Sequence, residues 1–363
     1  MQTVHRFASR TLLPSAPAFS PDGRHAYFGA RDGWITRFDL WSQRVDVEVR
    51  AGQQLLGLAL SSDGRWLAAA NAAPHSLVLF DVTLAPAKLF AGGTRDGLRS
   101  SAVASVHDAP ARRSFIVALR DVGELWEISY DPRAEDIYEG LVHDFRMGEG
   151  LPMRGFHNAR RTRLAEPLVD IGFDPDFIAA LGTAAADPSG QVVNLDVRRR
   201  IATLPIAGRP GLSGATAFLW QQRPVLAVPN RLRGSVAVLD LKDWRLLREI
   251  ATPGPGQAVR SHPRSPTVWA DASLSSEGSD TLTVIDRRSL EPLAPVREAG
   301  RRLGPVEFSH DGQRVLAGTL EANGLLIAWD ASRLTEIGRL PMRGPVGVYR
   351  VGEHVAGRSG GLR

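Results

Sequence analysis

The residues of this sequence with the clearest capacity for chemistry are its arginines. Arginine greatly outnumbers lysine among the 44 basic residues, and it recurs in the adjacent pairs Arg112-Arg113, Arg160-Arg161, Arg287-Arg288 and Arg301-Arg302. A guanidinium group can make two parallel hydrogen bonds to one carboxylate or phosphate, so this composition favours anionic ligands. A GC-rich genome that encodes Arg in place of Lys would give the same composition, and this alternative stays open.

One long segment, Tyr138–Pro167, concentrates such side chains and follows no regular pattern. Its basic residues include Arg146, Arg154, His157, Arg160, Arg161 and Arg163. Long irregular segments held on a rigid scaffold often carry binding residues. We therefore expect an inserted loop at about 138–167 that covers a flat, anionic ligand. A solvated surface excursion is the alternative interpretation.

Composition excludes several kinds of site. The chain has no cysteine, so it offers no disulfide framework, no thiolate metal site and no covalent attachment for a c-type haem. Its formal net charge is +5, but the arginines are scattered rather than gathered with aromatic residues, so we do not expect nucleic-acid binding. We find no apolar leader and no apolar stretch long enough to span a membrane, and we expect a soluble chain.

The elements that must position these residues are short strands in a repeated unit. In the first copy, Ala18–Arg50, a turn at Ser20–Gly23 separates two strands, and a second turn at Arg31–Gly33 leads to an alternating strand. Gly and Asp at the tight reversals are typical of antiparallel strands joined by short turns. Each copy therefore predicts one four-stranded blade of a β-propeller.

Later copies follow along the whole chain, and most end in an apolar-x-apolar-Asp pattern in which the Asp is expected to cap the next turn. They lie at Leu58–Val82, Val103–Tyr130, Val169–Val197, Ala215–Leu241, Gln257–Arg287 and Val306–Asp330. The two ends, Gln2–Leu13 and Gly344–Val355, are expected to pair and close the ring. The sequence thus predicts an all-β fold, a single propeller domain over 1–363 with about eight blades, and seven as the alternative.

Three stretches carry a resemblance to a known family. SPDGRHAYFGARDGWITRFDLW, at 20–41, resembles the start of the haem d1 propeller in the d1-haem nitrite reductases. Asp108–Trp126 and Arg160–Phe177 resemble the NirF-like proteins of haem d1 biosynthesis, and the second of these motifs is the more specific. The resemblance extends over most of the chain.

The resemblance implies a propeller that binds haem d1 or a late tetrapyrrole precursor at one mouth of its channel. It implies a part in a late step of haem d1 biosynthesis, either modification of a side chain or handover as a carrier. Expected partners are the tetrapyrrole and nitrite reductase or other maturation proteins, and the expected location is the periplasm. A cytoplasmic location is the alternative, because the chain as written shows no export signal. Whether the chain is an enzyme stays open, and a non-enzymatic propeller scaffold for a protein partner is the alternative function.

The resemblance also suggests roles for single residues. Arg31 becomes a candidate clamp for a ligand carboxylate, and Asp121 and His262 become candidate catalytic groups for proton transfer. Asn230 stands where the reductases have a second distal histidine. The candidate cofactor-binding residues are Arg31, Arg95, Arg154, His157, Arg160, Asn230 and Arg260. We expect Arg31, Asp121, His157 and His262 to meet at one mouth of the channel.

One departure from the family pattern concerns iron ligation. The relatives have a histidine just before the first blade, but residues 12–18 read LLPSAPA. His157 is therefore the first alternative as a haem-iron ligand, and nitrite reduction by this chain alone is not expected. The remaining histidines are expected to be surface or turn residues: His5, His25, His75, His107, His143, His310 and His354.

Overall fold

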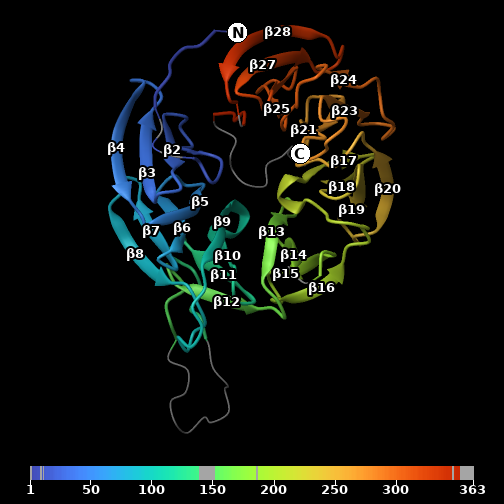
Figure 1. Cartoon of the computed structure of the whole chain (residues 1–363). Helices are drawn as coiled ribbons and strands as arrows, with labels where there is room; N and C mark the ends of the chain where they lie inside the picture. Colours follow the sequence, from blue (N-terminus) through green and yellow to red (C-terminus); the bar gives the residue numbers. More distant parts are fainter. Residues whose placement is uncertain are drawn as a thin grey trace. The chain divides into compact units, whose positions relative to one another are not determined.

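In the part of the chain that the structure describes, the regular elements are β-strands and two short 3-10 turns (Figure 1). The structure is a computed structural model that describes residues 2–8, 10, 12–138, 152–184, 187–345 and 347–351. In these residues the strands form seven four-stranded sheets, and each sheet uses four strands that are consecutive in the sequence. These sheets are the blades of a β-propeller fold, as the repeat predicted.

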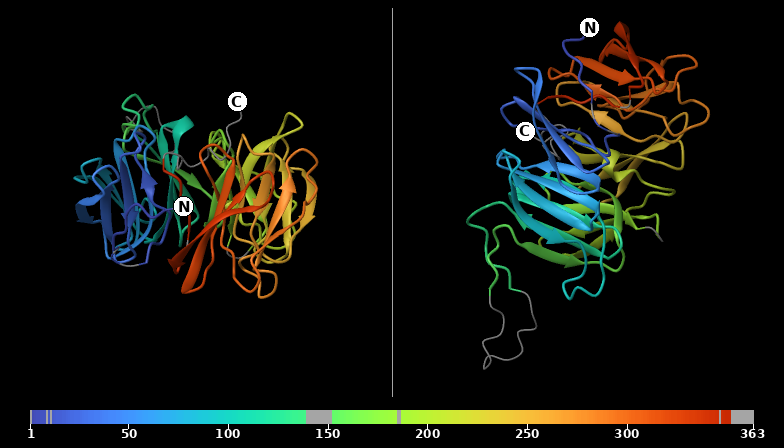
Figure 2. Two further views of the ribbon diagram at one scale, coloured as in Figure 1. Left: turned by 90° about the horizontal axis from the view of Figure 1, so that it is seen from above. Right: turned by 60° about the vertical axis from the view of Figure 1, so that its left-hand side comes forward.

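The chain divides into two compact units, here called the first unit (Phe7–Leu168) and the second unit (Val169–Val351, with residues 2–6). The first unit holds three sheets, drawn from blue to green in Figures 1 and 2. Their strands are β1 (Ala18–Phe19), β2 (His25–Gly29), β3 (Trp34–Asp39) and β4 (Arg44–Arg50); β5 (Gln54–Leu60), β6 (Trp66–Ala73), β7 (Ser76–Asp81) and β8 (Pro86–Ala91); and β9 (Val103–Ala109), β10 (Ser114–Leu119), β11 (Glu124–Ser129) and β12 (Ala159–Arg163).

The second unit holds the other four sheets. Their strands are β13 (Leu168–Phe173), β14 (Ala179–Ala184), β15 (Gly190–Asn194) and β16 (Arg199–Thr203); β17 (Thr216–Trp220), β18 (Arg223–Pro229), β19 (Ser235–Asp240) and β20 (Leu246–Ala251); β21 (Val259–Ser261), β22 (Thr267–Ala270), β23 (Thr281–Asp286) and β24 (Val296–Arg297); and β25 (Glu307–Phe308), β26 (Arg314–Gly318), β27 (Asn323–Asp330) and β28 (Glu336–Arg343). The 3-10 turns lie at Pro110–Arg112 and Leu212–Gly214.

Burial follows the position of a strand within its sheet. The second strands are apolar and buried along most of their length, as in β10, whose six residues are all buried. The fourth strands carry more polar residues and are more exposed, as in β16, where four of five residues are exposed. Separate apolar clusters fill each unit, with Phe115 and Trp126 at the centre of one in the first unit and Trp269 in one in the second. Burial of these large side chains is the main favourable term in stability.

The aspartates at the ends of the third strands cap the following turns, which confirms their predicted structural role. Asp39 Oδ1 accepts hydrogen bonds from the backbone N–H groups of Trp41 at 2.8 Å and Ser42 at 3.1 Å. The same kind of cap recurs in other sheets at Asp81, Asn194, Asp240, Asp286 and Asp330. A carboxylate or amide oxygen there satisfies turn N–H groups that have no strand partner.

The prediction of about eight blades was wrong, because the described residues form seven sheets. The seventh sheet already has its fourth strand in β28, and β1 begins the first sheet, so neither needs a partner from the opposite end of the chain. Residues 2–8 and 347–351 contain no strand. Pairing between the two ends of the chain is not seen among the described residues.

The Arg-rich insertion belongs to the third sheet rather than to a connection between sheets. Its residues Ala159–Arg163 form β12, which pairs with β11 as the fourth strand. Thr162 is buried and Arg163 is exposed, as expected for neighbouring residues of a strand, although the charge of this stretch suggested a loop. Residues 139–151, with Arg146 and His143, lie outside the described part of the chain.

Candidate functional site

Each sheet has two ends, and they separate the candidate residues into two groups. The turn that joins the second and third strands lies at the same end as the entry into the first strand, here called the 2–3 end. The turns that join the first to the second strand and the third to the fourth strand lie at the opposite end, here called the 1–2 end. This follows from four strands that run alternately up and down.

In the first unit, Arg31 and Asp121 lie in 2–3 turns, and Arg95 lies in the segment that enters β9. Arg154 and His157 lie at the 1–2 end of the third sheet, since the N–H of His157 donates to the carbonyl of Ser129 at 2.8 Å. The structure therefore brings Arg95 and Asp121 to one end of the third sheet and places His157 at the other. The expected meeting of Asp121 with His157 does not occur.

Arg31 lines a hollow of about 500 Å³, here called the Arg31 hollow. The backbone of Arg31 is fixed, because its N–H donates to Leu12 at 3.0 Å and its carbonyl accepts from Leu55 at 3.2 Å. Gly33 has a φ of +89°, and a Cβ there would lie 2.0 Å from the carbonyl oxygen of Gly52. The turn thus requires glycine, and it holds an exposed guanidinium over the hollow. The lining residues are Leu12, Arg31, Asp32, Gln53, Gln54 and Ala73.

A second hollow of about 630 Å³, here called the Arg99 hollow, lies at the 2–3 end of the third sheet. Its lining includes three arginines and two acidic residues: Arg95, Arg99, Arg163, Asp96 and Glu124. Arg99 is held by a hydrogen bond from Nη2 to the carbonyl of Asp121 at 3.0 Å. The excess of guanidinium groups favours an anionic group in this hollow.

A buried ion pair supports the Arg99 hollow from β12. Arg161 Nη1 donates to Glu124 Oε2 at 2.8 Å and to the carbonyl of Gly93 at 2.8 Å. Trp126 Nε1 donates to the same carboxylate oxygen at 2.9 Å, and the guanidinium lies 4.5 Å from the ring of Trp126. Arg161 thus neutralises Glu124 and ties the 92–100 segment to the sheet, so the other arginines of the hollow are not matched by this acid.

Asp121 closes a hydrogen-bonded clip within the third sheet. Its Oδ2 accepts from the N–H of Ala102 at 2.9 Å, and its own N–H donates to Ser101 Oγ at 2.9 Å. Burial acts to raise the pKa of Asp121, but the Ala102 hydrogen bond and Arg120 hold that pKa below its ordinary value. The carboxylate is therefore ionised at neutral pH.

The same clip recurs in other sheets, which gives Asp121 and Asn230 a structural role. Asp271 accepts from the N–H groups of Gln257 and Ala258 at 3.0 and 2.7 Å. The buried Asn230 accepts from the N–H of Arg209 at 3.2 Å and donates to the carbonyl of Ala207 at 2.7 Å. An Asp or Asn one or two residues after the second strand is the sequence signal for this clip. A catalytic role for Asp121 stays a prediction.

His157 is enclosed by aromatic side chains. Its ring stacks on Phe156 with centroids 3.8 Å apart and meets the edge of Trp66 at 4.2 Å. Its carbonyl accepts from Lys88 Nζ at 2.6 Å. Burial and the nearby Lys88 lower the pKa of His157 to about 4, so the ring is neutral. Packing accounts for this arrangement, and ligation of iron by His157 stays a prediction.

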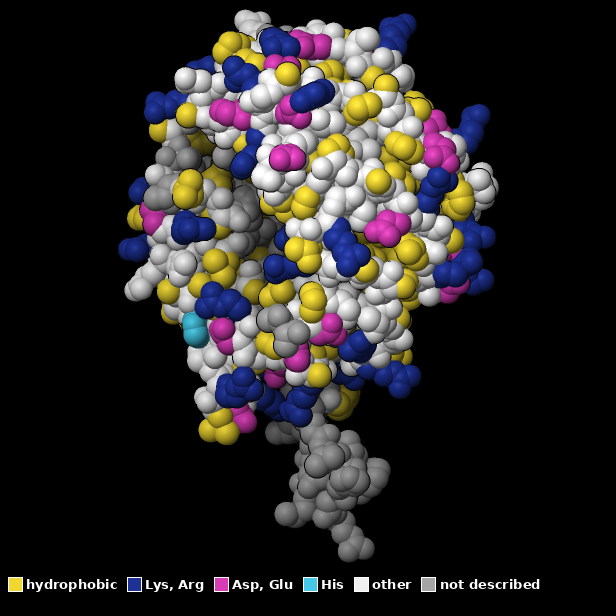
Figure 3. All heavy atoms as spheres, turned by 45° about the vertical axis from the view of Figure 1, so that its right-hand side comes forward, with side chains coloured by type: hydrophobic (Ala, Val, Ile, Leu, Met, Phe, Trp, Pro, Cys, Tyr) yellow, Lys and Arg dark blue, Asp and Glu magenta, His cyan; other side chains and the backbone are white. Residues whose placement is uncertain are grey.

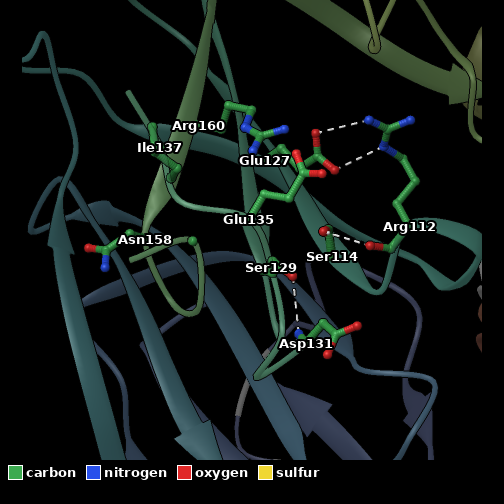
Figure 4. Close-up of a pocket in the computed structure, with 11 residues that line it drawn as sticks. Arg112, Ser114, Glu127, Ser129, Asp131, Glu135, Ile137, Asn158 and Arg160 are labelled. Carbon is green, nitrogen blue, oxygen red and sulfur yellow. Dashed lines mark hydrogen bonds and ion pairs between the residues drawn. The ribbon is translucent and has the colours of Figure 1, made fainter. Parts of the chain in front are cut away.

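Arg160 lines a smaller hollow of about 200 Å³ at the 1–2 end of the third sheet (Figure 4). There the acidic side chains Glu127 and Glu135 face Arg160 and Arg112. Arg112 Nε and Nη2 donate to the two oxygens of Glu127 at 2.9 and 3.1 Å. Because Arg112 is already paired with a carboxylate of the chain itself, this hollow suits an external anion less well than the Arg99 hollow does.

In the second unit, His262 lies at the 1–2 end of its sheet, in the turn after β21. The ring is buried, and its Nδ1 accepts from the N–H of Arg264 at 3.2 Å. Burial, together with Arg350 and Arg264, lowers the pKa of His262. Arg260 donates from Nη1 to the carbonyls of Gly214 and Val259 at 3.2 and 3.0 Å. Both side chains thus have structural partners, and their predicted site roles stay predictions.

Arg99 and His75, near the 2–3 ends, are not among the predicted site residues, and Arg163 is predicted only as part of the inserted loop. Arg99 and Arg163 line the Arg99 hollow, and His75 lies in the turn between β6 and β7. These residues become candidates only when each turn is assigned to one end of its sheet, and that assignment requires the order of the strands. The sequence signal that could have found His75 is its place in a 2–3 turn equivalent to the turn of Arg31.

Charge on the rest of the surface is mixed. The face in Figure 3 shows Lys and Arg side chains interspersed with acidic and apolar ones. Among the described residues, no group of three or more His, Asp or Glu side chains is arranged to hold a metal ion. No helix of the described chain is long and apolar enough to cross a membrane.

These observations define the class of protein as a β-propeller of four-stranded blades with arginine-lined hollows at the ends of sheets in its first unit. The family described as Cytochrome D1 heme domain matches residues 1–354, so the chain belongs to that family. This confirms the resemblance inferred from the motifs and connects the chain to haem d1 binding and biosynthesis.

Individual relatives agree with this membership. Dihydro-heme d1 dehydrogenase of Pseudomonas aeruginosa is 38% identical over 356 residues, which cover 98% of this chain and 68% of the relative. Protein NirF of the same organism is 30% identical over 351 residues, covering 93% of this chain and 82% of the relative. The solved structure of dihydro-heme d1 dehydrogenase NirN in complex with DHE has a TM-score of 0.87 and 38% identity, covering 97% of this chain and 71% of that chain.

Proposed function

We propose that this protein binds haem d1 or a late tetrapyrrole precursor and takes part in a late step of haem d1 biosynthesis. The observation that carries the proposal is the family match over residues 1–354. The relative of known structure with 38% identity was solved with a bound ligand, which supports the same conclusion.

The 2–3 ends of the first unit suit such a ligand. A tetrapyrrole of this pathway carries several carboxylates, and Arg31, Arg95 and Arg99 place guanidinium groups in two hollows at these ends. The ligand, when bound, supplies a conjugated ring and a redox-active iron. The protein binds and orients it through these arginines, and the ionised Asp121 holds the 101–102 backbone beside them through its hydrogen bond to Ala102.

Two modes of action follow from the relatives, and they predict different products. As a carrier, the protein would release the tetrapyrrole unchanged to nitrite reductase or another maturation protein. As an enzyme, it would modify a side chain. Removal of two hydrogens from a dihydro precursor, the reaction named for one relative, releases two electrons and two protons and needs an external electron acceptor. The periplasm is our proposed location for either activity.

An optical titration tests the binding step. Purified protein at micromolar concentration is mixed with haem d1 or its dihydro precursor, and a shifted Soret band is expected. Mass spectrometry of the recovered tetrapyrrole, with and without an added electron acceptor, then separates carriage from modification. Absence of any optical shift would reject the proposal and favour a scaffold for a protein partner.

Substitutions at the two sheet ends locate the site. Arg31→Ala and Arg99→Ala should each weaken binding by roughly tenfold or more, since each removes a charge-assisted hydrogen bond. Arg154→Ala, at the opposite end of the third sheet, is the matched control and should bind as the unmodified protein does. Equal losses in all three variants would count against the assignment to the 2–3 ends.

A further inference from the structure

His75 lies on the turn between the two arginine-lined hollows. Ala73, at the start of this turn, lines the Arg31 hollow. His75 itself contacts Ser100, whose neighbour Arg99 lines the Arg99 hollow. The imidazole therefore shares the 2–3 end with the arginines of both hollows, all within the first unit.

The orientation of the imidazole is set by its neighbours. His75 Nδ1 lies 2.6 Å from Ser100 Oγ, and that hydroxyl lies 3.4 Å from the carbonyl oxygen of Gly92. A hydroxyl that donates to Gly92 accepts the proton of Nδ1, which leaves Nε2 with its lone pair. The carbonyl of His75 also accepts from the N–H of Gly92 at 2.8 Å, so the backbone is fixed against the same segment.

The described part of the first unit shows no hydrogen bond at Nε2 of His75, and the residue is only half-buried. A histidine that ligates a metal usually donates its other ring nitrogen to an oxygen acceptor, which fixes the ring and raises its basicity. His75 has this arrangement, with Ser100 as the oxygen acceptor.

The other described histidines of the first unit lie elsewhere. His25 begins β2 and so lies at the 1–2 end of its sheet. His107 is a buried residue within β9, and His157 is enclosed by rings at the 1–2 end. Residues 12–18 contain no histidine. His75 is thus the described histidine of this unit that shares an end with Arg31, Arg95 and Asp121.

We propose that Nε2 of His75 contacts the bound tetrapyrrole as the ligand to its iron, with the carboxylates held by arginines of the adjacent hollows. This inference rests on the proposed function, because it presupposes that the tetrapyrrole binds. It assigns to His75 the role that the sequence suggested for His157.

The test compares haem d1 with its metal-free form on the unmodified protein, His75→Ala and His75→Gln. The unmodified protein is expected to give an imidazole-type absorption and electron paramagnetic resonance spectrum. In both variants this signature should be lost and the affinity for haem d1 should fall by about tenfold or more. Affinity for the metal-free tetrapyrrole should be unchanged, and free imidazole should restore the spectrum of His75→Ala. His25→Ala serves as the control and should behave like the unmodified protein.

The outcomes separate the two proposals. If the unmodified protein binds neither form, the proposed function fails and the inference falls with it. If it binds haem d1 but both His75 variants keep the same spectrum and affinity, only the inference is overturned. Circular dichroism of each variant confirms that a loss of signal is not a loss of fold, and the glutamine variant provides a second reading in case the alanine variant unfolds.

Discussion

Asp108 shows how a single buried carboxyl group links this fold to pH. Its Oδ1 accepts from the hydroxyl of Tyr130 at 2.8 Å, and that hydroxyl lies 2.9 Å from Ser62 Oγ. Its Oδ2 is buried and has no hydrogen-bond partner. Burial raises the pKa of Asp108 to about 7, although the Tyr130 hydrogen bond acts in the opposite direction. The group is therefore more easily protonated in the folded state than in the unfolded chain.

The raised pKa of Asp108 predicts that the free energy of unfolding depends on pH. At pH 4 Asp108 is protonated in the folded protein at little cost in stability. Between about pH 4 and pH 7 the carboxyl group loses its proton in the unfolded chain but keeps it in the folded protein. The free energy of unfolding therefore falls as the pH rises through this range. Asp108→Asn keeps the shape and removes the titration. We expect the free energy of unfolding of the variant, relative to the unmodified protein, to increase by about 4 kcal/mol from pH 4 to pH 8.

The comparison is made by urea denaturation of both proteins at several pH values. His107 and His157, whose pKa values are lowered to about 4 by burial, titrate in both proteins and cancel in the difference. Parallel stability curves for the two proteins would show that the Asp108 pKa is not raised.

At the scale of the element, strand β12 contributes two arginines that support and line the Arg99 hollow. Two arginines on this strand have different tasks: Arg161 is a partner of the buried Glu124, whereas Arg163 is exposed and lines the hollow. Sequence reasoning assigned both to one basic loop. It could not separate them, because the position of each arginine along β12, opposite Trp126 for Arg161 and opposite Glu124 for Arg163, follows from pairing with β11 and not from charge.

Substitution of these two arginines should separate stability from binding. Arg161→Ala leaves the Glu124 carboxylate buried without its cation, and we expect a loss of about 3 kcal/mol in the free energy of unfolding. Arg163→Ala removes an exposed charge and should change stability by less than about 0.5 kcal/mol, while it weakens tetrapyrrole binding. Denaturation and optical titration of both variants provide the measurement. A stable Arg161→Ala protein would mean that Glu124 is not the buried partner described above.

At the scale of the whole molecule, the repeat alone predicted the number of sheets to within one. The turns Ser-x-Asp and the Asp after each third strand are local signals, and Ser20, Asp22 and Asp39 make the contacts that those signals predict. The predicted eighth blade failed because Gly344–Val355 lacks both signals. The candidate site was harder, since the sequence predicts that Asp121 and His157 meet at one mouth of the channel, but they lie at opposite ends of one sheet.

The division of each sheet into two ends gives a prediction for the whole chain that hydrogen exchange can test. A ligand that binds the folded state only, at about 100 times its dissociation constant, stabilises it by about 2.7 kcal/mol and slows exchange of the amides that open at its site by roughly a hundredfold. We expect this protection in the first unit at residues 30–33, 73–76, 92–101 and 120–123, which form its 2–3 ends. Turns at the 1–2 ends, 61–65 and 109–113, should exchange at the same rate with and without haem d1. In the second unit, protection of the turn at Asn230 tests the prediction that this residue binds the ligand. Protection confined to 154–158, around His157, would instead place the ligand at the opposite end and overturn the assignment of the arginine-lined hollows.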